Sequence, residues 1–259
     1  MGIIHLITLS GNSKRFTEKG YEHKALCEVN GASMVEMFVK SFKDFHEHEN
    51  IFLCRNEDLD STTRLKEEIN KHASDAKVLG IESNDLGPVY SISKIFERLD
   101  DDRPILISYI DTLQKTSIGN MLESFDGYDG GMTIHDFNNP HWRTSKSYCL
   151  VEHDGFMNVT NVVEKYPFKD ADFLDKHKSG SSGNYFFQQC GTMKHYCNRL
   201  MSQDVKVNNE FYMTQAMENM VKDGLKVKAY PCPYAALGTP EDLEDYGFWM
   251  RWFNDSNIS

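Results

Sequence analysis

The residues with the clearest chemical potential are a glycine, two short polar side chains and two cations that follow one apolar run. In the stretch HLITLSGNSKRFTEKGYEHK, Gly11, Asn12 and Ser13 come just after the run, and Arg15 and Lys24 follow. A loop of small residues lets backbone N–H groups approach a phosphate, because large side chains would block them. The pattern therefore indicates an anion-binding loop, with a surface turn carrying solvated cations as the alternative. It has neither the P-loop nor the G-x-G-x-x-G spacing.

The segments on either side of this loop must position it. Four apolar runs are predicted as strands and three segments with helical periodicity as helices, and they alternate along the chain. The predicted strands are residues 2–9, 50–55, 76–82 and 104–111, and the predicted helices are 33–45, 61–73 and 88–99. This alternation predicts right-handed crossovers and a mostly parallel sheet covered on both faces. Because ligands of such sheets bind at the carboxyl ends of the strands, we expect Gly11 and Asp111 to meet there.

After Asp111 the pattern changes. Residues 144–167 and 181–187 read as antiparallel strands, residues 210–224 as a helix closed by Gly224, and residues 225–233 as a final strand. The predicted fold class is therefore α/β, a single Rossmann-like domain with a mostly parallel central sheet, flanking helices and a small antiparallel addition.

Composition excludes several kinds of function. The chain has 259 residues with 28 Lys and Arg against 39 Asp and Glu, and its net charge of −11 disfavours binding to nucleic acid or to anionic membranes. There is no charged segment followed by an apolar leader and no long apolar run, so we expect a cytoplasmic protein. The six cysteines lack metal-binding spacing and are expected to be reduced. The aromatic tail, residues 247–259, is a candidate homodimer contact.

Several motifs resemble one enzyme family. The segments LSGNSKRF and GYEHKALCEVNGASMVEMFVKSF are similar to the signature of the sugar-phosphate nucleotidyltransferases, which have the nucleotide-diphospho-sugar transferase fold. SYIDTL, NVVEKYP, SSGNYFF and ALGTPEDLEDY resemble further motifs of that family, in the same order over roughly residues 1–246. The subgroup most resembled includes capsule and surface-polysaccharide enzymes and small-molecule cytidylyltransferases.

The resemblance implies a GT-A-type domain spanning residues 1–259, with a nucleotide-binding half (1–112), an acceptor-binding half (113–246) and a tail (247–259). It implies Mg²⁺-dependent transfer of an NMP from an NTP, with CTP favoured, to a phosphorylated small molecule, with release of pyrophosphate. The acceptor would be a sugar 1-phosphate or a non-sugar phosphate such as phosphocholine or a phosphorylated amino acid.

The resemblance also assigns roles to individual residues. The catalytic residues would be Arg15, Lys24 and Asp111, with Asp111 also the metal ligand. The nucleotide-binding residues would be Leu9, Ser10, Gly11, Asn12, Ser13 and Gly87. The acceptor-binding residues would be Glu164, Lys165, Gly183 and Asn184. Independently of the resemblance, His141 and Trp142 are candidates for lining the same pocket, with packing or solvated side chains as the alternative.

The sequence departs from the family pattern at Ala236, where many relatives have a second metal-binding aspartate. Either Glu210 or Asp136 replaces that aspartate, or one protein ligand is enough. The nearby GTPEDL segment is interpreted mainly as a helix start capped by Thr239. Two other classes stay open, a glycosyltransferase that uses a nucleotide sugar and a non-catalytic nucleotide-binding relative.

Overall fold

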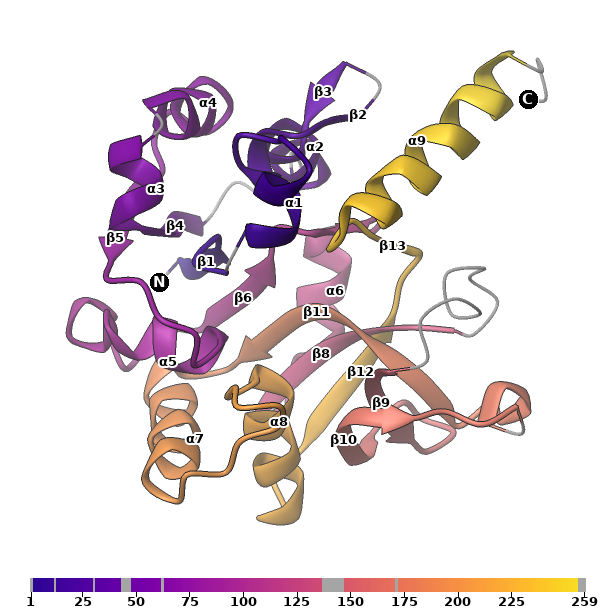
Figure 1. Cartoon of the computed structure of the whole chain (residues 1–259). Helices are drawn as coiled ribbons and strands as arrows, with labels where there is room; N and C mark the ends of the chain where they lie inside the picture. Colours follow the sequence, from indigo (N-terminus) through magenta and orange to yellow (C-terminus); the bar gives the residue numbers. More distant parts are fainter. Residues whose placement is uncertain are drawn as a thin grey trace.

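A mixed β-sheet forms the centre of the molecule (Figure 1). The computed structural model describes residues 2–11, 13–29, 31–42, 48–61, 63–136, 147–170 and 172–255. Within these residues the main sheet has nine strands. They are β1 (Ile3–Thr8), β4 (His48–Arg55), β5 (Lys77–Ile81), β6 (Ile105–Tyr109), β8 (Gly130–His135), β9 (Ser147–His153), β10 (Val159–Pro167), β11 (Lys178–Phe187) and β12 (Val227–Pro231).

The strand order is β10-β9-β11-β6-β1-β4-β5, and β8 pairs with both β11 and β12. Strands β6, β1, β4 and β5 are parallel, whereas β11 runs antiparallel to β6, β8 and β9. The predicted fold class is confirmed, because the first half forms the parallel part of the sheet and the second half adds the antiparallel part. The finer division into nucleotide-binding and acceptor-binding halves stays a prediction.

Helices cover both faces of the sheet. They are α1 (Lys14–Glu18), α2 (Met34–Ser41), α3 (Asn56–Ser61), α4 (Thr63–His72), α5 (Pro88–Ser93), α6 (Ile118–Ser124), α7 (Cys190–Ser202), α8 (Met213–Lys222) and α9 (Pro240–Asp255), with short 3-10 turns η1 (Lys24–Leu26), η2 (Phe96–Arg98) and η4 (Asp172–Leu174). Within the described residues, two small antiparallel pairs lie apart from the main sheet. They are β2 (Glu28–Val29) with β3 (Ala32–Ser33), and β7 (Thr112–Gln114) with β13 (Tyr234–Ala236).

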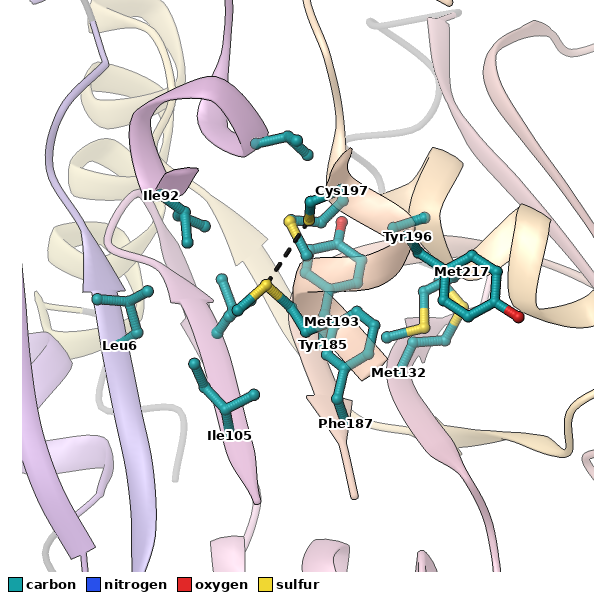
Figure 2. Packing of buried hydrophobic residues seen from close by; sticks show 14 of the residues in the cluster. Leu6, Ile92, Ile105, Met132, Tyr185, Phe187, Met193, Tyr196, Cys197 and Met217 are labelled. Carbon is teal, nitrogen blue, oxygen red and sulfur yellow. Dashed lines mark hydrogen bonds between the residues drawn. The ribbon is translucent and has the colours of Figure 1, made fainter. Parts of the chain in front are cut away.

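The alternating side chains of β1 explain why both faces are covered. Leu6 packs into a core cluster with side chains from α5, α7 and α8, including Ile92 and Met193 (Figure 2). Its neighbour Ile7 packs on the opposite face with side chains from α2, α4 and α6, including Phe38. Since successive side chains of a strand point to opposite faces, an uninterrupted apolar run is what a two-sided sheet requires.

Local capping signals behave as the sequence predicts. The Ser33 hydroxyl accepts a hydrogen bond from the Glu36 N–H at 3.0 Å and begins α2. Gly224, with a φ of +83°, follows the end of α8. Among the described residues, no helix is both long and apolar enough to cross a membrane.

Candidate functional site

A cavity of about 180 Å³ opens where β1 and β6 end. Its lining includes five residues that the sequence marked as functional. They are Ser10, Gly11, Lys24, Gly87 and Asp111. The expected meeting of Gly11 with Asp111 is therefore present, and the parallel arrangement of β1 and β6 accounts for it.

The first wall of the cavity is the loop that follows β1. The N–H of buried Leu9 donates to the Leu53 carbonyl at 2.8 Å, which ties the base of the loop to β4. A Cβ atom on Gly11 would lie 3.6 Å from the Lys24 Nζ, so glycine keeps this part of the loop open beside the ammonium group. Ser13 is buried outside the cavity lining, and Asn12 lies outside the described residues.

An ion pair forms part of the cavity lining. Lys24 Nζ donates to Asp111 Oδ2 at 2.9 Å, and the two side chains are 11% and 26% exposed. Lys24 begins η1, which the His23 ring caps by accepting a hydrogen bond from the Ala25 N–H. A cation able to neutralise phosphate and an oxygen ligand suited to Mg²⁺ are thus held at one point.

The position next to Asp111 is occupied by a methyl group. Strand β13 pairs with β7 so that Ala236 lies opposite Thr112, and the Leu237 N–H donates to the Asp111 carbonyl at 2.8 Å. The position at which the sequence pattern lacks a second aspartate therefore lies beside Asp111 in the structure, where Ala236 offers no metal ligand. Asp111 still fits a magnesium site, since Mg²⁺ keeps several waters and takes its other ligands from substrate phosphates.

Other carboxylates near this point have local partners. Asp242 Oδ2 accepts a hydrogen bond from the Thr239 N–H at 2.9 Å, and Thr239 Oγ1 accepts one from the Asp242 N–H at 3.1 Å. These bonds confirm the predicted helix start at α9. Glu210 lines the same cavity as Asp111, whereas Asp136 is outside its lining.

A group of metal-ligating side chains elsewhere is explained by ion pairing. In the described part of the chain, the set of three such residues close enough to share an ion is Glu36, Glu68 and His72, on α2 and α4. Lys40 pairs with Glu36, and Lys71 with Glu68, so this cluster carries its own counter-charges.

The second wall of the cavity is the loop before α5. Gly87 has a φ of +86°, and a Cβ atom there would lie 2.9 Å from both the Glu210 Cβ and the Phe211 carbonyl oxygen. Backbone hydrogen bonds from Val89 to Phe211 and from Phe211 to Leu86 join the two segments. Only glycine allows this close approach with this backbone conformation, so the predicted importance of Gly87 has a structural reason.

Sequence reasoning missed Arg55, which lies outside the cavity lining but is bonded to both loops that form its walls. It ends β4, is 8% exposed, and its guanidinium donates to the carbonyls of Ser10 and Asn84 at 3.1 and 3.4 Å. It also pairs with Glu57 at 2.7 Å. A charged residue at the end of the apolar run NIFLCR was the available signal, but such a residue also simply marks a strand boundary.

The predicted acceptor residues of β10 are outside the cavity lining, and Lys165 lies near one residue of that lining. Lys165, with a φ of +55°, places its Nζ 5.4 Å from the ring centroid of Tyr212, which lines the cavity. The neighbouring Glu164 carboxylate is 7% exposed and accepts a hydrogen bond from the Thr214 hydroxyl. Burial raises the pKa of Glu164. Arg15 is exposed on α1, outside the cavity lining.

Gly183 and Asn184 lie inside the sheet. A Cβ on Gly183 would come within 3.1 Å of the Thr112 Cγ2, so glycine lets β11 approach the turn that carries Asp111. Asn184 is buried, and its Nδ2 donates to the Gln114 Oε1 at 2.9 Å. Both lie outside the cavity lining, and His141 and Trp142 lie outside the described residues.

Known proteins resemble this chain in sequence and in fold. No family model matches the sequence. The bifunctional protein GlmU of Alkalilimnicola ehrlichii is 26% identical over 153 residues, which are 58% of this chain and 31% of that protein. The chain thus spans about a third of the length of the curated relative it matches.

Solved structures match almost the whole chain. The nucleoside-diphosphate-sugar pyrophosphorylase of Vibrio cholerae is 19% identical over 95% of this chain and 100% of that chain, with a TM-score of 0.76. A UDP-glucose pyrophosphorylase complexed with UDP-glucose is 13% identical over 97% and 99%, with a TM-score of 0.73. The inositol-1-phosphate CTP transferase of T. maritima is 13% identical over 97% and 96%, with a TM-score of 0.68.

The chain has the fold of these sugar-phosphate nucleotidyltransferases. The resemblance predicted from the sequence is confirmed in the fold, and the match to GlmU agrees with it. These comparisons leave the cytidylyltransferase subgroup and the individual site residues as predictions.

Proposed function

We propose that this protein is a nucleotidyltransferase that transfers an NMP from an NTP to a phosphorylated small molecule and releases pyrophosphate. The observation that carries the proposal is the cavity in which the loop of Gly11, the Lys24 ammonium and the Asp111 carboxylate converge. Two anionic substrates must approach each other in this reaction, and the cavity concentrates the groups that neutralise and position phosphate.

In the proposed reaction, a phosphate oxygen of the acceptor forms a bond to the α-phosphorus of the NTP. The bond from that phosphorus to the oxygen bridging to the β-phosphate breaks, and pyrophosphate leaves with the electron pair. Lys24 would neutralise charge on the phosphates, and the backbone beside Gly11 would bind the triphosphate. Asp111 would hold Mg²⁺, which when bound supplies further charge neutralisation.

The side chains near Gly87 support a base that carries an amino group. Asp85 and Glu210 line this part of the cavity, and ionised carboxylates accept hydrogen bonds without donating them. The Asn84 side chain is already engaged, because it accepts from the Leu86 N–H and donates to Ser91. Cytosine has an exocyclic amino group at the position where uracil has a carbonyl, so we infer a preference for CTP over UTP.

Two cations that act on the ring of Tyr212, a residue of the cavity lining, support a phosphorylated acceptor. Lys165 lies over the Tyr212 ring. The charge of Arg15 opposes the rise in the pKa of Tyr212 that burial and Glu210 cause, so Arg15 is within electrostatic reach of the same ring. We propose that these two cations bind the acceptor phosphate, of either the sugar or the non-sugar kind, and that the product serves capsule or surface-polysaccharide synthesis in the cytoplasm.

A homodimer is part of the same proposal. Helix α9 exposes Phe248, Trp249 and Trp252, and these large aromatic side chains are 54%, 47% and 44% exposed. An exposed aromatic surface of this kind is a candidate subunit contact.

The test is pyrophosphate release with Mg²⁺, in which the four common NTPs are crossed with sugar 1-phosphates, phosphocholine, phosphoethanolamine and phosphorylated amino acids. Release that requires one NTP and one acceptor together supports the proposal and names both substrates. Hydrolysis of a nucleotide sugar without pyrophosphate release would instead indicate a glycosyltransferase. Specific NTP binding without turnover by any pair would indicate a non-catalytic relative, in which Ala236 is the first position to examine.

A further inference from the structure

Arg55, the last residue of β4, is bonded to the loops that follow the two neighbouring parallel strands β1 and β5. Its Nε donates to the Ser10 carbonyl in the loop after β1, and its Nη2 donates to the Asn84 carbonyl in the loop after β5. Its Nη1 donates to Glu57 in α3, and Asp85 lies 3.7 Å from Nη2. One planar guanidinium group thus connects both walls of the cavity.

These bonds involve the backbone of the loops, so Arg55 fixes where the loops lie relative to each other. The Arg55 side chain is 10% exposed and is not part of the cavity lining, so it does not offer its donors to a ligand in the cavity. Lysine, with a single ammonium group, cannot reproduce the fixed fork of donors that reaches both carbonyls.

Each loop is also held by hydrogen bonds that do not involve Arg55. The base of the loop after β1 is held by the hydrogen bond from the Leu9 N–H to the Leu53 carbonyl. The loop before α5 is held by the backbone hydrogen bonds from Phe211 to Leu86 and from Val89 to Phe211, and by the side chain of Asn84. Loss of Arg55 would therefore leave each loop folded, but the separation between the two loops would no longer be fixed.

We propose that Arg55 is a positioning residue that sets the separation between two loops. These are the loop after β1, which would bind the triphosphate, and the loop before α5, which would bind the base. This inference rests on the proposed function, because it takes the cavity to bind an NTP along its length. An NTP joins its base and triphosphate covalently, so it binds well only when both loops lie at the matching separation. A fragment that contacts one loop alone does not need that separation.

A second arginine provides a matched control at the other end of the same strands. Arg103 donates from Nε to the Gly2 carbonyl at 3.0 Å and from Nη1 to Glu49, at the amino end of β1 and β4. It makes the same kinds of bonds as Arg55 with a side chain that is 20% exposed, but far along the strands from the cavity. Replacing it tests the general effect of losing such an arginine.

The experiment compares wild type, Arg55→Lys and Arg103→Lys. Binding of CTP with Mg²⁺ is measured by calorimetry, and binding of cytidine and of inorganic triphosphate by ligand-observed NMR. We expect Arg55→Lys to raise the Kd for CTP by about 10-fold, because CTP binding must then also fix the loop separation, while the Kd values of the two fragments change by less than about 2-fold. Arg103→Lys should leave all three constants unchanged.

The outcomes separate this inference from the proposed function. Wild-type protein that binds no NTP overturns both. Wild-type binding of CTP with an unchanged Kd in Arg55→Lys overturns the inference alone, as does equal weakening of CTP and of both fragments, which is what a general structural role predicts. If Arg55→Lys does not fold, Glu57→Gln replaces it, because Glu57 is 57% exposed and anchors the same guanidinium. The same selective loss of CTP affinity is expected, at about 3-fold.

Discussion

The two sides of the site differ in how closely the predicted residues converge. On the nucleotide side, Gly11, Lys24 and Asp111 come from positions up to a hundred residues apart and line one cavity. On the acceptor side, Lys165 is outside the cavity lining but near its Tyr212 ring, whereas Asn184 is buried within the sheet. The first set follows from a rule of topology, that parallel strands end at one edge. The second set rests on motif similarity, and a residue of a motif can stabilise the sheet without contacting a ligand.

Among the variants of the nucleotide side, Lys24→Ala should affect activity most. Because Lys24 is the cation paired with Asp111 inside the cavity, its loss should reduce kcat by about 10²- to 10³-fold, as removal of one preorganised charge-stabilising group does. Steady-state pyrophosphate release measures this. Lys19→Ala is the control, since Lys19 pairs with Glu241 outside the cavity and should keep full activity. Equal activity of the two variants would remove Lys24 from the proposed mechanism.

A smaller effect is expected at Gly87, where backbone conformation and close contact coincide. Gly87→Ala places a Cβ 2.9 Å from the Phe211 carbonyl oxygen at a φ of +86°, so the loop must move away from Phe211. We expect the KM for the NTP to rise by about 10-fold and the free energy of unfolding to fall by about 1–3 kcal/mol. Kinetics and chemical denaturation measure the two effects.

Gly127→Ala separates the two causes. Gly127 has a similar φ of +76°, but a Cβ there would meet nothing within 4 Å. Its replacement should cost about 1 kcal/mol of stability and leave the KM for the NTP unchanged. A similar rise in KM in both variants would show that Gly87 acts through stability and not through the base-binding loop.

The extent to which this site could be predicted follows from the same contrast. Gly11 and Asp111 were predictable because alternating strands and helices fix which edge of the sheet they share. The pairing of β13 with β7, which puts Ala236 beside Asp111, depends on segments more than a hundred residues apart that carry no periodic signal. Arg55 was missed because its partners are backbone carbonyls, and a backbone acceptor leaves no trace in residue types.

Lys165→Ala tests whether the acceptor side is functional at all. If Lys165 binds the acceptor phosphate, its loss should raise the KM for the acceptor by about 10-fold and leave the KM for the NTP unchanged. Lys228→Ala is a matched control, because Lys228 also lies over a tyrosine ring, that of Tyr128, at 4.9 Å. An acceptor KM that responds to neither variant would assign acceptor binding to other residues.

The smallest effect concerns Glu164, whose burial raises its pKa. The folded protein therefore holds this proton more tightly than the unfolded chain, and Glu164 lowers stability as pH rises above the ordinary carboxyl pKa of 4.5. Glu164→Gln removes this destabilising charge. The Tm of the variant should therefore rise relative to that of wild type as pH increases from 4 to 8, by about 2–4 °C for each kcal/mol of unfolding free energy regained. Thermal melts across this range measure the gain.

Glu49 should behave in the opposite way, because hydrogen bonds from Lys77 and Arg103 lower its pKa. Its negative charge stabilises the folded state above the ordinary pKa and loses this effect as pH falls, so Glu49→Gln should lower the Tm more at pH 8 than at pH 4. If Glu164→Gln shows the opposite pH trend to Glu49→Gln and keeps the acceptor KM of wild type, Glu164 is a buried structural carboxyl. Acceptor binding would then depend on Lys165 and not on Glu164. A raised acceptor KM would instead give the buried carboxyl a role in binding, and its destabilising charge would be the cost of that role.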